Sequence, residues 1–288
     1  MAANPPWRIP QQVIIPLSIL MIIFATFSFT GYHSPFREGG QAKLFTTSRT
    51  PTEEHFLNLR KRASHWSYHP LHVVPAIIWS LAMPLQHHDR FRLRFPLLHR
   101  LAGYLILLLS LLLSLTGYLF FFTSNAYTHP NLFHLHALPG LPSPLLRWPT
   151  FELTLWLIAP FYWLTIYKTA AAARARDFPR HRRWAVLHTI CASFISVERV
   201  SLVVLLGAGF ATSFLPREAV HGFFGVGRGV EEMAEAEMAV FALANTMTHV
   251  VILSWLAYEC ARAGYFDAAK GYLSSRAEDR RVLDKKVE

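Results

Sequence analysis

Long uninterrupted runs of apolar residues constrain this chain more than any other feature of its sequence. The clearest run, 101–122, reads LAGYLILLLSLLLSLTGYLFFF and contains no charged side chain. A helix of roughly 17–25 apolar residues has the length that crosses a hydrocarbon layer about 30 Å thick. Because the bilayer core offers no water to backbone N–H and C=O groups, lipid-exposed segments of this kind must be helical. We therefore predict an all-α fold, a polytopic transmembrane helical bundle.

Other runs of similar character bring the predicted number of spans to about six. They cover residues 13–29, 71–86, 151–169, 184–210 and 238–261. The first run lacks the features of a cleaved signal peptide and is predicted to be an anchor. The run 71–86 contains Pro75 and Pro84 and is expected to be kinked or re-entrant at its ends. The predicted organisation is an anchor span with a polar loop (1–70), a helical membrane core (71–264) and a charged cytoplasmic tail (265–288).

Basic residues in the connections predict which ends of the spans face the cytoplasm. The formal charge is +10. Cytoplasmic loops of membrane proteins collect Lys and Arg, so this charge does not indicate nucleic-acid binding. The basic residues of the second–third and fourth–fifth connections are Arg90, Arg92, Arg94, Arg100, Lys168, Arg174, Arg176, Arg180, Arg182 and Arg183, whereas the third–fourth connection has only Arg147. Both termini are then cytoplasmic, although the triplet 60–62 (Arg-Lys-Arg) falls on the opposite side.

Ionisable and polar residues inside the predicted spans are the candidate functional residues. A charge in a membrane helix costs roughly 2.5–3.5 kcal/mol on insertion scales and usually faces a bundle interior or cavity. The span 184–210 contains such charges, and helical spacing places His188 and Cys191 on the same face as Glu198 and Arg199. We predict one polar pocket in the outer half of the membrane, formed by His72, Glu152, Glu198, Arg199, Asn245 and His249. The alternative is that these groups only bond helices together.

Two other groups of histidines receive weaker interpretations. His129, His134 and His136 could bind a metal in an outer loop, but the chain has 15 histidines and chance clustering explains the spacing, so no metal site is predicted. His188 is expected to be a helix-contact residue. The clusters at the cytoplasmic boundaries are predicted to pack together and bind lipid or substrate headgroups, with plain topogenic charge as the alternative; they are His99, Arg100, His181, Arg182 and Arg183.

Three sequence blocks resemble the DUF2306-type family of integral membrane proteins. They are His72 with Pro84 and Gln86; Leu98-His99-Arg100 with Gly103-Tyr104; and Tyr167 with His181-Arg182-Arg183-Trp184, followed by Arg199. The chain departs from the family where a Gly-Gly pair is replaced near Val74 and Pro75, and where Leu187 stands in place of an arginine. The resemblance implies a membrane topology more than a chemistry. In size and layout the chain is also similar to small fungal membrane-bound terpene cyclases of the ascofuranone and macrophorin type.

Three functions are compatible with these residues. The first is an enzyme that cyclises a prenylated, meroterpenoid-like substrate by protonation, with Glu198 as the acid and aromatic walls around the cation. It needs no cofactor, and it implies a hydrophobic substrate, the lipid bilayer and the endoplasmic reticulum or another endomembrane. The second is a redox protein holding haem b, for which His72 and His249 are the candidate ligands. The third is a small-molecule or lipid transporter, although no internal repeat is visible. The oligomeric state is left open.

Overall fold

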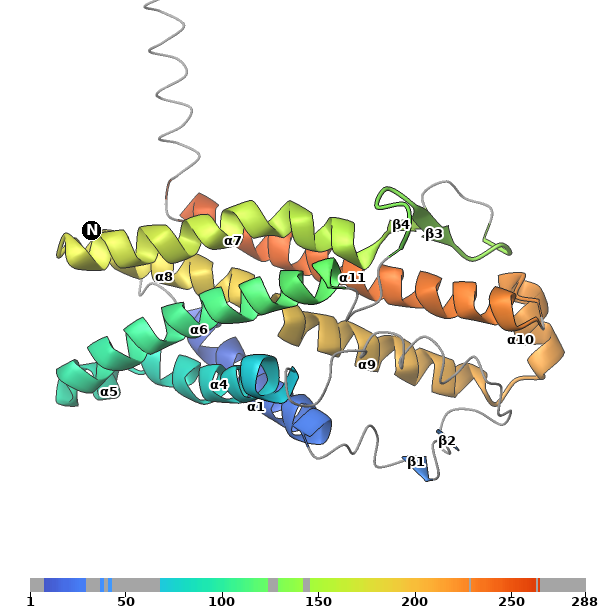
Figure 1. The fold of residues 1–288 in the computed structure, drawn as a ribbon, viewed down its shortest axis with the longest axis horizontal. Helices are drawn as coiled ribbons and strands as arrows, with labels where there is room; N and C mark the ends of the chain where they lie inside the picture. Colours follow the sequence, from blue (N-terminus) through green and yellow to red (C-terminus); the bar gives the residue numbers. More distant parts are fainter. Residues whose placement is uncertain are drawn as a thin grey trace, which may run out of the picture.

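The computed structural model describes residues 8–29, 37–38, 41–42, 68–123, 129–141, 146–227, 229–262 and 264, and most of these are helical. The elements in chain order are α1 (Arg8–Phe29), β1 (Arg37–Glu38), β2 (Gln41–Ala42), the π-helical turn η1 (His69–Val73), α4 (Val74–Gln86), α5 (Asp89–Arg94), α6 (Pro96–Phe122), β3 (Leu135–Ala137), β4 (Arg147–Pro149), α7 (Phe151–Arg174), α8 (Phe178–Ala192), α9 (Phe194–Thr212), α10 (Arg217–Phe224) and α11 (Val230–Arg262). The all-α prediction is confirmed, and Figure 1 shows the long helices running along one another.

Three helical segments of the described chain are long and apolar enough to cross a membrane. They are Pro96–Phe122, Phe178–Thr212 and Glu235–Arg262, and a shorter apolar helix covers Gln12–Thr26. In the most apolar stretch of α6, only 28% of the residues are buried inside the protein. Leu108, in the middle of this helix, is 63% exposed. An apolar helix that leaves such residues uncovered is suited to lipid, so the chain is a membrane-embedded protein.

The predicted spans correspond to helices whose ends differ from the predicted ones. Helix α6 begins at Pro96 rather than Leu101, because proline is well placed at the first helical position, where its missing N–H is not needed. Helix α11 begins at Val230 rather than Met238 and so carries several acidic residues ahead of its apolar part. The span 71–86 begins in the π-helical turn η1, and Pro75 and Pro84 both lie in α4.

The predicted span 184–210 lies within the candidate span Phe178–Thr212, which is interrupted at one residue. The span 184–210 is not a single regular helix, since α8 ends and α9 begins at Ser193. The Ser193 hydroxyl donates to the carbonyl of Thr189 at 2.8 Å, and its backbone N–H lies near the carbonyls of both Thr189 and Ile190. Serine that bonds back to the preceding turn often bends a helix. Cys191 before this residue and Glu198 and Arg199 after it nevertheless line the same cavity, whereas His188 does not.

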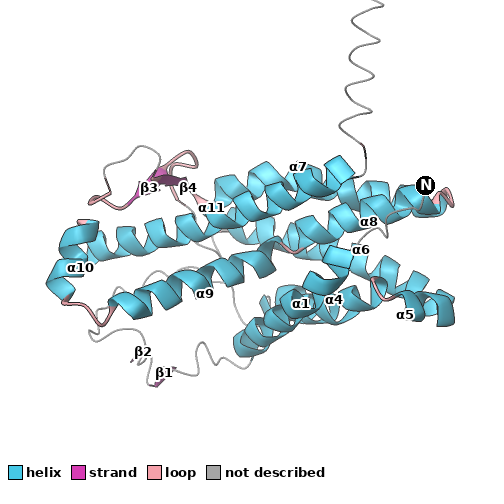
Figure 2. Ribbon diagram, turned by 180° about the vertical axis from the view of Figure 1, so that it is seen from behind, coloured by secondary structure: helices cyan, strands magenta, loops and turns pink. Residues whose placement is uncertain are grey.

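The two ends of the bundle differ in chemistry. Helix α5, the start of α6 and the turn between α7 and α8 lie together at one end, whereas α10 and the β3–β4 hairpin lie at the other (Figures 1 and 2). The first end contains both of the arginine-rich connections on which the predicted topology depends. The triplet 60–62 and the charged tail 265–288 lie outside the described residues.

An ordered β-hairpin at the second end was not predicted. Strands β3 and β4 pair antiparallel, with His136 opposite Trp148. Beneath them a small apolar core joins the hairpin to α11; its buried members are Leu138, Trp148, Ala239 and Ala242. Gly140 donates its backbone N–H to the carbonyl of Phe224 at 2.8 Å. This backbone contact brings the end of α10 against the hairpin.

Candidate functional site

A cavity of about 280 Å³ lies among α1, η1, α4, α6, α7, α8 and α9. Its walls are mainly apolar and aromatic, and the aromatic lining residues are Trp79, Tyr118, Phe120, Phe121, Phe151, Tyr162 and Phe194. Apart from the two tyrosines and Cys191, its ionisable lining residues are His72, Glu198 and Arg199. Small-molecule sites typically combine an apolar, concave surface with a few convergent polar groups. The cavity has this character.

The Glu198 carboxyl group and the Arg199 guanidinium lie within ion-pair distance at the α9 wall of the cavity. Arg199 Nη1 lies 3.4 Å from Glu198 Oε2, and Glu198 has no solvent exposure. The Arg199 guanidinium also lies 5.7 Å from the ring centroid of Phe24 on α1, so it sits between a carboxyl group and an aromatic face. Adjacent residues on a helix diverge by about 100°, and both nonetheless reach the cavity because their long side chains turn toward each other.

His72 faces this pair from η1, and its hydrogen bond fixes its tautomer. Nδ1 lies 3.0 Å from Thr116 Oγ1. The Thr116 hydroxyl makes its shortest contact with the carbonyl of Leu112, at 2.8 Å, and a carbonyl can only accept. The hydroxyl proton is thus committed, so His72 Nδ1–H is the donor and Nε2 is the ring nitrogen that can take up a proton. Arg199 is close enough to His72 to act on it electrostatically.

The structure does not bring the other half of the predicted pocket into the cavity. Asn245 and His249 share a face of α11, as predicted, but neither lines the cavity. Asn245 Nδ2 donates back to the carbonyl of Phe241 at 2.9 Å. His249 Nδ1 and Nε2 lie 3.0 Å from the carbonyl of Asn245 and 2.8 Å from that of Thr154. Each ring nitrogen therefore lies beside a carbonyl oxygen, and a neutral imidazole can donate to only one of them.

Glu152 is also separate from the cavity. It stands in the first turn of α7, where its Oε1 accepts the backbone N–H of His129 at 2.8 Å. Thr150, the residue before that helix, caps Leu153 N with its hydroxyl group. A carboxylate near a helix N-terminus is stabilised by the free N–H groups there. Glu152 thus fastens the outer loop to the beginning of α7.

His188 joins three helices through buried hydrogen bonds beside the cavity. Trp79 Nε1 donates to Ser110 Oγ at 2.8 Å, so the Ser110 hydroxyl can donate to His188 Nε2, which is 3.0 Å away. On the other side, Nδ1–H donates to Thr165 Oγ1 at 3.2 Å. One placement of hydrogens satisfies this chain of bonds between α4, α6, α8 and α7. It holds the cavity wall without entering it.

The histidine–arginine clusters meet at the arginine-rich end, where each histidine residue makes one hydrogen bond to a neighbouring segment. Gln86 Nε2 donates to the carbonyl of His99 at 3.1 Å, and His181 Nδ1 donates to the carbonyl of Thr169 at 3.0 Å. His181 is close enough to His99 to act on it electrostatically. The arginines of these clusters, Arg100, Arg182 and Arg183, are exposed.

Sequence reasoning missed one buried carboxyl group on α11. Glu259 on α11 has no solvent exposure, and its Oε1 lies 4.0 Å from Arg262 Nη1. The signal was present, since Glu259 belongs to the apolar run 238–261. It does not line the cavity. Among the described residues, the buried glutamates Glu198 and Glu259 each lie beside an arginine, and Glu198 is the one of the two that lines the cavity.

The chain was compared with protein-family models, curated proteins and solved structures. No family model, no curated protein and no solved structure matches the chain.

Proposed function

We propose that this chain is a multi-pass membrane enzyme that cyclises a prenylated substrate by protonation. The observation that supports this function best is the placement of Glu198, Arg199 and His72 on one aromatic cavity of about 280 Å³. Acid-initiated cyclisation needs a proton donor, a surface that tolerates a carbocation and a base that ends the reaction. The cavity offers a group for each requirement.

In this mechanism Glu198 donates a proton to a terminal alkene or epoxide of the prenyl chain. The π electrons of the next double bond then close a ring, and the last cation loses a proton to His72 Nε2. Substrate and product are isomers, and proton return from His72 to Glu198 restores the enzyme. Arg199, 3.4 Å from Glu198, stabilises the carboxylate that exists after donation. The cationic stages are stabilised by the faces of the surrounding aromatic rings.

The proposal includes the arrangement in the membrane. About six spans place both termini and both arginine-rich connections in the cytoplasm. The exposed arginines Arg100, Arg182 and Arg183 then lie at the membrane surface, where they can contact lipid headgroups or the polar end of a substrate. An endomembrane such as the endoplasmic reticulum is the proposed location. The apolar cavity indicates a substrate that partitions into the bilayer.

The test uses microsomes that contain the full chain and a panel of farnesylated phenols, with and without a terminal epoxide. We expect a product of unchanged mass and altered chromatographic retention from at least one substrate. In D₂O, protonation of an alkene adds one non-exchangeable deuterium to carbon, which cyclisation by hydride or radical chemistry does not. A product whose mass differs from that of the substrate in ordinary water would contradict the proposed mechanism. So would a product formed from an alkene substrate in D₂O without deuterium on carbon.

A further inference from the structure

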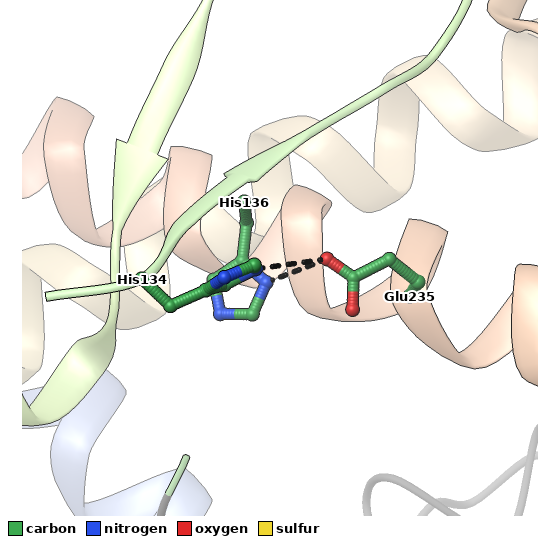
Figure 3. Close-up of side chains that lie close together, drawn as sticks. All are labelled: His134, His136 and Glu235. Atoms are coloured by element: carbon green, nitrogen blue, oxygen red, sulfur yellow. Dashed lines mark hydrogen bonds and ion pairs between the residues drawn. The ribbon is translucent and has the colours of Figure 1, made fainter. Parts of the chain in front are cut away.

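Two imidazoles and a carboxylate converge where the β3–β4 hairpin meets the first turns of α11. Glu235 Oε1 lies 2.9 Å from His136 Nδ1 and 3.5 Å from His134 Nε2. The three ligand atoms lie within 4.8 Å of one another. Figure 3 shows both rings directed at the same carboxylate oxygen. These residues are remote in sequence, since the two histidines belong to the hairpin and Glu235 to the following long helix.

The scaffold around this cluster is built from several independent contacts. His136 is nearly fully buried, at 1% exposure, and its strand pairs with β4 in a fixed register. The apolar core under the hairpin includes Ala239, one helical turn after Glu235. The ring of His129 stacks on that of His134, with centroids 4.2 Å apart. A metal site requires ligands whose rotamers are held by such packing.

One of the three candidate ligand atoms makes no well-formed hydrogen bond with the protein. His134 Nε2 is shielded from solvent and has no hydrogen-bond partner within good geometry. Buried polar atoms usually have partners, so each exception asks for an explanation. Glu235 Oε1 is closer to His136 Nδ1, at 2.9 Å, and its separation of 3.5 Å from His134 Nε2 is long for a hydrogen bond. A cation between the three atoms would give each of them a partner.

The geometry points to a site for a divalent zinc-type transition-metal ion, held by His134 Nε2, His136 Nδ1 and Glu235 Oε1. Two imidazoles and a carboxylate are a donor set that zinc accepts, with metal–ligand distances of about 2.0–2.2 Å. Tetrahedral ligands at those distances stand roughly 3.3–3.6 Å apart. His134 Nε2 and His136 Nδ1 lie 3.5 and 2.9 Å from Glu235 Oε1, and all three atoms lie within 4.8 Å of one another, so small side-chain rotations would bring them to that geometry. The side chains of His134 and Glu235 are 35% and 47% exposed, so solvent can reach a fourth position.

The ion would fasten the hairpin to α11 at the end of the bundle opposite the arginine-rich connections. Its ligands come from both the β3–β4 hairpin and α11, so a bound ion would hold the hairpin against that helix. His134, His136 and Glu235 do not line the cavity. The metal site therefore does not depend on the cyclisation proposed for the cavity.

The experiment measures metal binding by the full chain in detergent after treatment with a chelator. Co²⁺ is the probe, because tetrahedral nitrogen and oxygen ligation gives it a visible absorption, and Zn²⁺ is the competitor. We expect one equivalent of Co²⁺ to be bound and then displaced by Zn²⁺. Glu235→Gln keeps an amide oxygen for His136 and so preserves the contact between hairpin and helix, yet it should weaken binding at least about 10-fold. His134→Ala should do the same.

Two controls separate this site from other histidines and carboxylates. His88→Ala removes an exposed histidine at the opposite end, and Glu259→Gln removes a buried carboxylate remote from the hairpin sequence. Both should bind Co²⁺ as the wild type does. Gel filtration of each variant checks that it is folded. The inference is overturned if the wild type takes up no Co²⁺ or Zn²⁺, or if Glu235→Gln and His134→Ala bind both ions as tightly as the wild type.

Discussion

Burial sets the protonation of His87, which directly follows α4. Its Nε2 lies 2.9 Å from Thr189 Oγ1, and the Thr189 hydroxyl itself donates to the carbonyl of Ala185 at 2.8 Å. The imidazole is therefore the donor in this bond. Burial, with a smaller contribution from His99, lowers the pKa of His87 from 6.5 to about 4. The folded protein accordingly holds this ring neutral at pH values where an unfolded chain would protonate it.

This shift makes stability depend on pH in a defined direction. Between pH 6.5 and about 4 the unfolded state binds more protons than the folded state, so stability falls as the pH falls through that window and is fully present above it. We expect His87→Gln to lose less thermal stability than the wild type when the pH is lowered from about 7 to about 5. Thermal unfolding in detergent measures this, with exposed His88→Gln as the control. An unchanged pH slope in His87→Gln would assign the acid sensitivity elsewhere.

At the residue scale, the sequence indicated part of the cavity and not the rest. His72, Glu198 and Arg199 were identifiable because ionisable groups inside apolar runs are costly. The polar Asn245 and the ionisable His249 also lie inside an apolar run, yet they bond to backbone carbonyls of α11 and α7. When a helix is apolar on all sides, its sequence does not indicate how it is rotated about its own axis in the bundle. Which polar face adjoins a cavity therefore became known only from the packing.

At the scale of elements, two glycines let the hairpin approach the segment between α10 and α11. A Cβ at Gly140 would collide with the backbone of Phe223 and Phe224, and a Cβ at Gly225, whose φ is +63°, would collide with Gly140. We expect Gly140→Ala to cost about 1–3 kcal/mol of stability, as overpacking against backbone does. Gly209→Ala on α9 is the matched control, because nothing lies within 4 Å of its Cβ. Thermal unfolding should separate the two variants, and equal stability would contradict the close packing.

The long elements could be predicted from the sequence, whereas the short ones could not. The run 101–122 could only be a helix, because its length and lack of charge exclude other structures in a membrane. Strands β3 and β4 have 3 residues each in a loop with several prolines, too short for an alternating pattern to register. The break at Ser193 was equally hidden, since a single serine in an apolar run is compatible with a continuous helix. Its effect arises from one hydroxyl bond to Thr189.

At the scale of the whole molecule, the proposed topology places the hairpin and the α7–α8 connection on opposite sides of the membrane. Phe133 is 72% exposed beside the hairpin, and Arg180 is exposed at the start of α8. In a background with Cys191 and Cys260 replaced by alanine, we expect Arg180→Cys to react with a membrane-impermeant maleimide in sealed, cytoplasm-out microsomes. Phe133→Cys should react only after detergent is added. Equal labelling of both variants in intact vesicles would refute an odd number of crossings between them.

The most direct test of the proposed chemistry compares the two buried carboxyl groups. Glu198→Gln and Glu259→Gln each remove one from a pair with arginine, but only Glu198 lines the cavity. If Glu198 is the acid, its variant should lower cyclisation by at least about 10², the usual scale of general acid catalysis, while remaining folded. Glu259→Gln should keep turnover near that of the wild type. Turnover by folded Glu198→Gln equal to that of Glu259→Gln would contradict the central claim.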